Sequence, residues 1–338
     1  MIKYLGSKRL LIPSILEQLR SLPGPIESVL DVFSGTSRVG HALKREGYRV
    51  IANDHNAYAA TLARCYVQAD REAVEHDARR LIEEFAALPG RAGYFTETFC
   101  EKARFFQPRN GERVDAIRDA IEAKSLPPEL KAVVLTSLME AADRVDSTTG
   151  VQMAYLKQWA ARAHNELRLR MPDVLPRAAA GPGLAEERDA IDVASAHQVD
   201  VAYLDPPYNQ HKYLGNYHIW ETLVRWDRPE AYGIAQKRID AKVRKSAFNS
   251  RVDFVSAFEA LIAAVRARYL VVSFSNEGFL KRADADRILG SRGSVRVIEH
   301  DYKRYVGAQI GIFNPSGDKV GKVSHLRNTE QLFVVTVH

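Results

Sequence analysis

The stretch IESVLDVFSGTSRVGHALKREGYRVIANDHN, residues 26–56, contains the clearest pattern of secondary structure in the chain. Residues 29–33 form a short apolar run that is typical of a strand buried on both faces. After a turn that contains Gly35, apolar residues recur at helical spacing until Gly47, and a second apolar run ends at Asp54. Strand, helix and strand in this order predict a βαβ unit with a right-handed crossover. The fold class expected from it is α/β, with a parallel sheet.

The strand pattern is interrupted and resumes late in the chain. Residues 61–170 show helical periodicity with almost no strand signal, and residues 170–184 are rich in Pro, Gly and Ala, as in a linker. Further strands are expected at residues 199–205, 268–276, 294–306 and 330–338. We therefore predict a Rossmann-like sheet domain that carries a mostly helical insert. The predicted boundaries are 1–60 and 185–338 for the sheet domain and 61–184 for the insert.

Two helices of the insert can be placed by their ends. Asn110 is a candidate N-cap for a helix whose apolar residues Val114, Ile117 and Ile121 fall on one face. A second helix is expected to begin at the prolines of PPELKAVVLTSLMEAADRV, because proline is tolerated in the first turn.

Composition fits a globular chain of one large domain or of a domain with an insert. The chain has 338 residues, of which 46% are hydrophobic and 27% charged. It contains no apolar run of roughly 20 residues that would span a bilayer and no secretory signal at its start, so we expect a cytoplasmic protein without a membrane partner. Two cysteines and scattered histidines show no metal-ligand spacing, so no metal is expected.

The net charge of +6 is modestly basic, which suits a polyanionic partner but also fits many proteins that bind no nucleic acid. Residues 236–251, QKRIDAKVRKSAFNSR, gather six Lys and Arg residues against one acid. This segment is either a nucleic-acid contact or a solvated loop or helix face, and the pattern favours neither reading.

Three acids are expected at strand ends: Asp31, Asp54 and Asp205. Because the carboxyl ends of parallel strands share one edge of a sheet, where ligands of open α/β sheets bind, these acids should border one site. The turn after Asp31 lacks the Lys and Ser or Thr of a phosphate-binding P-loop and lacks the second glycine of a dinucleotide loop. Asp54 lies 19 residues after Gly35, a spacing that suits an acid bound to ribose hydroxyls.

An adenosine without a pyrophosphate satisfies these observations, and S-adenosylmethionine is the commonest cofactor of that kind. The competing interpretation is a structural glycine turn followed by a surface acid. Asp205 is followed at once by Pro206, Pro207 and Tyr208. Two prolines end a strand and hold the chain extended, so Asp205 has little conformational freedom. Taken alone, this tetrapeptide could also be a tight turn with a packed tyrosine.

Three motifs occur in order: KYLGSK at 3–8, DVFSGTSRVG at 31–40 and DPPY at 205–208. With a large insert between the second and the third, the chain resembles the Dam-like DNA adenine methylases, and the resemblance extends more weakly into the insert. It implies transfer of a methyl group from S-adenosylmethionine to the exocyclic amino group of adenine in duplex DNA. It also implies that the insert, residues 61–184, recognises the DNA target site. The protein would be a solitary methylase or the modification enzyme of a restriction-modification system. A partner endonuclease would then form no stable complex with it, and the chain would be a monomer or a dimer.

The resemblance also assigns roles to individual residues. Asp205 and the Pro206 carbonyl are expected to accept the two amino hydrogens of a flipped-out adenine, Pro207 to hold this geometry and Tyr208 to stack on the base. An acid that borders the cofactor's adenine is expected at Asp189, with Asp192 as an alternative. Residues expected at the cofactor are Tyr4, Gly6, Lys8, Asp31, Phe33, Ser34, Gly35, Thr36, Asp54 and Asp189. Residues expected at DNA are Lys212, Lys242, Arg244, Lys245, Lys303, Arg304 and Arg327.

Two other functions remain open at this point. The same pocket could methylate an RNA adenine or a protein glutamine, both of which present a planar amino group. The chain could also be a DNA-binding regulator that retains a methyltransferase fold without catalysis.

Overall fold

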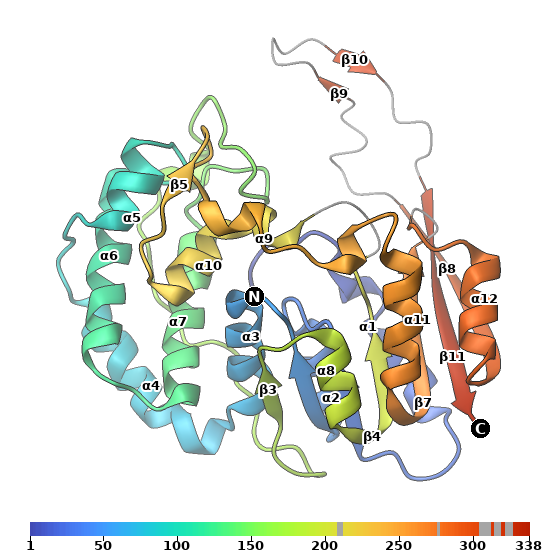
Figure 1. Cartoon of the computed structure of the whole chain (residues 1–338). Coiled ribbons are helices and arrows are strands. Elements are labelled where there is room, and N and C mark those ends of the chain that lie inside the picture. Colours follow the sequence, from blue (N-terminus) through green and yellow to red (C-terminus); the bar gives the residue numbers. More distant parts are fainter. Residues whose placement is uncertain (208–211, 276–277, 304–311, 314–318, 322–326) are drawn as a thin grey trace.

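A computed structural model describes residues 1–207, 212–275, 278–303, 312–313, 319–321 and 327–338, the side chains of 301–328 excepted. Its centre is a seven-stranded sheet in the order β3-β2-β1-β4-β7-β11-β8 (Figure 1). The strands are β1 Ser28–Asp31, β2 Arg49–Asn53, β3 Leu184–Glu186, β4 Gln198–Leu204, β7 Arg266–Ser275, β8 Gly293–Lys303 and β11 Arg327–Val337. Two small pairs lie outside the sheet: β5 Ala231–Tyr232 with β6 Lys237–Arg238, and β9 Ile312–Phe313 with β10 Lys319–Gly321.

The α/β prediction is confirmed, with a mixed rather than a wholly parallel sheet. Strands β3, β2, β1, β4 and β7 run parallel to one another, whereas β11 runs antiparallel to both β7 and β8. Strand β3 was not predicted from the sequence. It has only three residues, of which only Ala185 is buried, so it lacks the apolar run that marks the other strands.

Both faces of the sheet are covered by helices, because successive residues of each strand point to opposite faces. Val29 and Val50 pack with α1 and α2 on one face, whereas Leu30 and Ile51 pack with α8, α11 and α12 on the other. These helices are α1 Ile12–Arg20, α2 Arg38–Arg45, α8 Ala190–Ala196, α11 Phe254–Ala264 and α12 Arg282–Gly290.

A second body of helices lies beside the β3 end of the sheet (Figure 1). Its helices share one apolar core with Ile2 and with residues 217–223, so the chain returns to this core after leaving it. The longer members are α3 Ala57–Ala63, α4 Arg71–Ala86, α6 Pro108–Ala123, α7 Pro128–Asp143 and α10 His218–Arg225. The shorter members are η2 Arg64–Gln68, α5 Tyr94–Thr96, η3 Glu97–Glu101, η4 Ala161–His164 and α9 Tyr213–Asn216. Three further short turns are η1 Lys8–Leu10, η5 Ile239–Lys242 and η6 Ala247–Asn249.

The predicted cap at Asn110 is wrong. Helix α6 begins two residues earlier, at Pro108, and Asn110 lies buried inside it. The Asn110 side chain instead donates to the Asn165 carbonyl at 2.9 Å and accepts from the Leu167 amide at 3.0 Å. Because proline already supplies the start of α6, the asparagine is free to hold the following loop. The prolines before α7 lie at its start as predicted.

The strand directions bring the expected acids together. Asp31 ends β1, and Asp54 and Asp205 directly follow β2 and β4, all at one edge of the sheet. The antiparallel β11 places its amino-terminal part at the same edge, where Glu330 pairs with Ser275 at the end of β7. Within the described part of the chain, none of the helices combines the length and the hydropathy needed to cross a bilayer.

Candidate active site

A pocket opens at this edge of the sheet, at the point where β1 and β4 lie side by side. It contains every described residue that was predicted for the catalytic and cofactor sites, except Asp189. The predicted residues that line it are Tyr4, Gly6, Lys8, Asp31, Phe33, Ser34, Gly35, Thr36, Asp54, Asp205, Pro206 and Pro207. Lining residues that were not predicted are Ser7, Arg38, Val39, His55, Asn56, Tyr203 and Tyr213.

The turn after β1 is shaped by Gly35. Its φ of +50° lies in the left-handed region, and a Cβ there would come within 3.2 Å of the Tyr4 ring. The Gly35 amide donates to Asp54 Oδ2 at 3.1 Å, while Asp54 Oδ1 accepts from the amide and the side chain of Asn56. The turn and the acid that was predicted to hold a ribose are therefore fixed to each other.

Asp31 lies at the bottom of the pocket and is almost fully buried. Neither of its carboxylate oxygens has a well-formed hydrogen bond to a described residue. Burial, together with the nearby charges of Asp205 and Asp54, raises the pKa of Asp31 to about 8, and the backbone of Gly40 partly opposes this. A buried carboxylate without a cation is costly, so this position favours a positively charged ligand.

Aromatic rings form one wall of the pocket. Tyr4 stacks on Tyr217 with ring centroids 4.7 Å apart and on Tyr213 at 5.3 Å. Its hydroxyl lies 3.3 Å from that of Tyr58, and burial raises its pKa well above the ordinary value. Tyr217 is buried and packs behind Tyr4.

Asp205 meets a cation at the end of β4. Lys8 Nζ lies 3.1 Å from Asp205 Oδ1 and also forms an ion pair with Glu330. Burial raises the pKa of Asp205 to about 6, which Lys8 partly opposes and Glu330 reinforces. The Lys8 side chain was predicted to lie near the methionine end of a cofactor, and the structure places its ammonium between two acids.

Glu330 was missed by sequence reasoning. It is 1% exposed and accepts a hydrogen bond from Ser273 at 2.5 Å. A signal was present, because Glu330, Leu332 and Val334 alternate along β11 and the two apolar members are buried on one face. The expectation that site residues follow the ends of parallel strands excluded it, since β11 runs the other way.

Asp189 lies outside the pocket lining. Its exposed side chain caps α8 by accepting from the Ile191 amide at 2.8 Å. Asp192, the alternative, is exposed in the first turn of the same helix. Which of the two borders a bound adenine stays a prediction.

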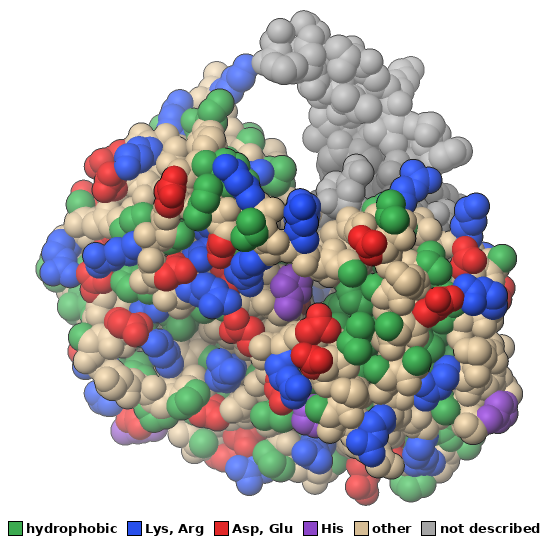
Figure 2. Space-filling view, in the orientation of Figure 1, with side chains coloured by type: hydrophobic (Ala, Val, Ile, Leu, Met, Phe, Trp, Pro, Cys, Tyr) green, Lys and Arg blue, Asp and Glu red, His purple; other side chains and the backbone are tan. Residues whose placement is uncertain are grey.

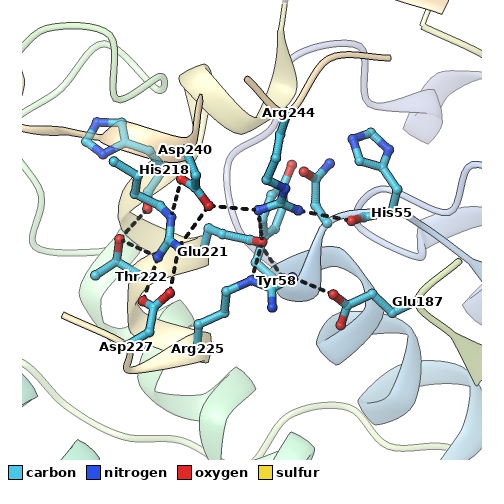
Figure 3. A network of polar contacts seen from close by, with 12 residues as sticks. His55, Tyr58, Glu187, His218, Glu221, Thr222, Arg225, Asp227, Asp240 and Arg244 are labelled. Carbon is cyan, nitrogen blue, oxygen red and sulfur yellow. Dashed lines mark hydrogen bonds and ion pairs between the residues drawn. The ribbon is translucent and has the colours of Figure 1, made fainter. Parts of the chain in front are cut away.

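The basic segment 236–251 divides into buried and exposed residues. Arg244 donates to the fully buried Glu221 at 2.8 Å and to the His55 carbonyl at 3.2 Å, next to Asp54 (Figure 3). Burial would raise the pKa of Glu221, but hydrogen bonds from Arg225 and Arg244 outweigh it and lower that pKa. The guanidinium of Arg244 is thus engaged within the chain.

The other residues expected at DNA are solvent-facing where they are described. Lys212 and Lys245 are exposed, and Lys242 is exposed with its ammonium 4.1 Å from the Tyr232 ring centre. Lys and Arg side chains alternate with acids over the face shown in Figure 2 and form no single-sign patch there. The DNA contacts therefore stay predictions.

Some expected residues cannot be located. Tyr208 and Arg304 lie outside the described residues. Lys303 and Arg327 pair through their backbones at the ends of β8 and β11, while their side chains are not described.

Comparison with known proteins places the chain among DNA methyltransferases. Residues 4–282 match the family of D12 class N6 adenine-specific DNA methyltransferases. The chain is 29% identical over 328 residues to Type II methyltransferase M.FokI of Planomicrobium okeanokoites and 27% over 334 residues to Modification methylase StsI of Streptococcus sanguinis. Each alignment covers about nine-tenths of this chain, 90% and 91%, but only 50% of the relative.

Another relative is matched along nearly its whole length. Type II methyltransferase M.NlaIII of Neisseria lactamica is 28% identical over 315 residues, which cover 90% of this chain and 92% of the relative. The family match includes the turn around Gly35, the acid at the end of β2 and the Asp-Pro-Pro sequence after β4. The chain belongs to the D12 class of N6 adenine-specific DNA methyltransferases.

Proposed function

We propose that this protein transfers a methyl group from S-adenosylmethionine to the N6 amino group of adenine at a specific site in duplex DNA. The observation that supports this best is the single pocket lined by Asp31, Asp54 and Asp205. Two of these acids suit the cofactor, and the third suits the amino group that is methylated. The relatives are named Type II methyltransferases and a modification methylase, and for the present chain we propose a restriction-modification context with a cognate endonuclease.

The chemistry of the pocket fits this cofactor. Within the part of the chain that the structure describes, the buried Asp31 carboxyl group has no well-formed hydrogen bond and two further acids lie close to it, so a cation bound beside it would be stabilised. S-adenosylmethionine, when bound, supplies a methyl group on a positively charged sulfonium. Asp31 would hold its cationic methionine end, and Asp54, already fixed to the Gly35 turn, would accept from its ribose hydroxyls.

Asp205 and Pro206 would act on the target base. The amino nitrogen of adenine is a weak nucleophile, because its lone pair is delocalised into the ring. One N–H donated to Asp205 and one donated to the Pro206 carbonyl would favour a pyramidal nitrogen with its lone pair directed at the methyl group. Acceptors fixed before the reaction need not reorganise during it. The methylated nitrogen then releases one proton, for which the Asp205 carboxylate is the nearest proposed acceptor.

A base within a duplex cannot reach this pocket, so the adenine must be extruded at a cost of a few kcal/mol. The aromatic wall around Tyr4 shows that the pocket edge already carries ring surfaces. Tyr208 is the residue expected to stack on the extruded base, which is worth about 1–3 kcal/mol.

The test is labelling of DNA with a tritiated methyl group. Purified protein should label a duplex DNA library, and methylation-aware sequencing of that DNA should find N6-methyladenine in one sequence context. Asp205→Asn should reduce the rate by a factor of about 100 or more while cofactor binding persists. The exposed Asp286→Asn on α12, an acid outside the pocket, serves as the matched control and should retain activity.

Three results would contradict this proposal. Full activity in Asp205→Asn would remove Asp205 from the mechanism. Labelling of RNA or of a protein glutamine in preference to duplex DNA would assign another substrate. Binding of DNA without labelling over a broad set of sequences would favour a non-catalytic regulator.

A further inference from the structure

A buried lysine shared by two acids is the least expected feature of the pocket. Lys8 is 8% exposed, and its ammonium contacts both Asp205 and Glu330. One acid belongs to the segment that follows β4 and the other to the antiparallel strand β11. Asp205 alone would neutralise the charge of the Lys8 ammonium, so the presence of Glu330 needs a separate explanation.

The second acid is itself held in place. Ser273 on β7 donates to Glu330 Oε1, the same oxygen that meets Lys8. Strands β7 and β11 are paired over seven consecutive positions from Glu330↔Ser275 onward, so neither residue can move without disturbing the sheet. Glu330 therefore presents a rigid acceptor for the ammonium, whereas Lys8 itself lies in the short turn η1.

This arrangement determines how the ammonium meets Asp205. Lys8 approaches Oδ1 at 3.1 Å from a position fixed by Glu330. With one oxygen occupied, Asp205 cannot rotate freely to offer either oxygen to a substrate. Because Lys8 is shared, its attraction for Asp205 is weaker than that of an undivided ion pair, and Asp205 keeps more of its strength as an acceptor.

We propose that Glu330 and Ser273 are positioning residues for methyl transfer, which hold Lys8 so that Asp205 offers Oδ2 to the target amino group. This inference rests on the function proposed above. It assigns to strand β11 an influence on the reacting acid that acts through Lys8, since Glu330 itself touches neither substrate nor cofactor.

The pH dependence gives a signature that a merely structural role would not produce. The groups that face Asp205 are Lys8, Glu330, Asp31 and Tyr203. Of these, Glu330 raises the pKa of Asp205 and Lys8 lowers it. Removal of the Glu330 charge should therefore move the acidic limb of the rate profile to lower pH, and removal of the Lys8 charge should move it to higher pH.

The experiment compares Glu330→Gln, Glu330→Asp and Ser273→Ala with wild type. Glu330→Gln should reduce kcat by a factor of about 10–100 and leave cofactor affinity within about threefold, since a small misplacement of a reacting group has an effect of this size. Its acidic limb should shift to lower pH. Glu330→Asp should have a higher kcat than Glu330→Gln. Ser273→Ala should also reduce kcat, by a smaller factor than Glu330→Gln. Glu299→Gln, at an exposed position on β8, is the matched control.

A second readout does not depend on turnover. The carboxyl carbon signal of Asp205, identified by its absence in Asp205→Asn, should titrate at lower pH in ligand-free Glu330→Gln than in wild type. An unchanged titration, or loss of kcat with an unmoved acidic limb, would overturn the inference even in an active enzyme. A shifted titration in a protein that labels no DNA would support the arrangement of Lys8, Glu330 and Ser273 and would refute the proposed function instead.

Discussion

Glu221 in the helix cluster and Asp31 in the pocket are both buried acids, but their pKa values are shifted in opposite directions. Glu221 receives hydrogen bonds from two arginines and one backbone amide, and its pKa is lowered despite full burial. No cation from the described residues pairs with Asp31, and burial with the nearby acids raises its pKa to about 8. Asp205 is an intermediate case: it shares the Lys8 ammonium with Glu330, and burial raises its pKa to about 6.

This difference in partners distinguishes a buried acid with a structural role from a buried acid that suits a ligand site. The carboxylate of Glu221 is satisfied within the chain and joins α10 to the start of α3 and to the basic segment (Figure 3). Asp31 has no such partner among the described residues, so its charged form would be stabilised by a bound cation. A buried acid that the protein leaves unpaired is therefore a better indicator of a ligand site than an acid within a network.

The largest expected effect is on stability at Glu221. Glu221→Gln should lower the free energy of unfolding by about 3–5 kcal/mol, because it leaves Arg225 and Arg244 without their shared partner. Urea denaturation at pH 7 measures this. Glu187→Gln, which removes only an outer partner of Arg225, is the control and should cost less than about 1 kcal/mol. A Glu221 variant as stable as wild type would show that the network is not needed for folding.

The next effect is on cofactor binding at Asp31. Asp31→Asn should weaken S-adenosylmethionine binding by about 1.5–3 kcal/mol, the usual contribution of a hydrogen bond to a charged group. Asp205→Asn is the matched variant and should change the affinity far less while reducing kcat. Calorimetric titration of both proteins separates the two acids. Equal losses of affinity would remove the distinction between a cofactor acid and a substrate acid.

Sequence reasoning located the pocket because its main parts are local. Each motif can be recognised within a short segment: the Gly35 turn, the acid 19 residues later and the two prolines after Asp205. The parallel strands then bring these segments together at one pocket. The same reasoning could not find Glu330, whose place depends on the antiparallel direction of β11. Strand direction is a property of the whole sheet, and a single strand pattern does not contain it.

Charge was harder to interpret than the motifs. Within residues 236–251, Arg244 binds Glu221, and Arg238 is buried between Asp227 and Asp240, whereas Lys242 and Lys245 are exposed. A run of basic residues looks the same in sequence whether it meets solvent or buried acids from distant segments. Asn110 shows the same limit, because its partners come from the loop after η4.

A smaller effect is expected in the pH dependence of stability without ligand. An acid with a raised pKa contributes stability at low pH that is lost as the pH rises through its folded value. For Asp31, ionised above about pH 4 when unfolded and above about 8 when folded, the loss between pH 6 and 8 should be about 2 kcal/mol. Asp31→Asn should remove this part of the decline and be more stable than wild type at pH 8. Parallel curves for the two proteins would show that Asp31 ionises normally.

The smallest effect tests the shape of the pocket rather than its charge. Gly35→Ala should cost about 1–2 kcal/mol, because alanine is strained at a φ of +50° and its Cβ would crowd the Tyr4 ring. The turn also holds Asp54, so cofactor affinity should fall together with the melting temperature. Gly290→Ala, at the end of α12, where an added Cβ would meet no atom within 4 Å apart from the neighbouring residues and the backbone of its own helix, should be neutral or slightly stabilising. If Gly35→Ala lowers the melting temperature but leaves cofactor affinity intact, the turn matters for folding alone. The unpaired carboxylate of Asp31 would then carry the cofactor site without help from the loop above it.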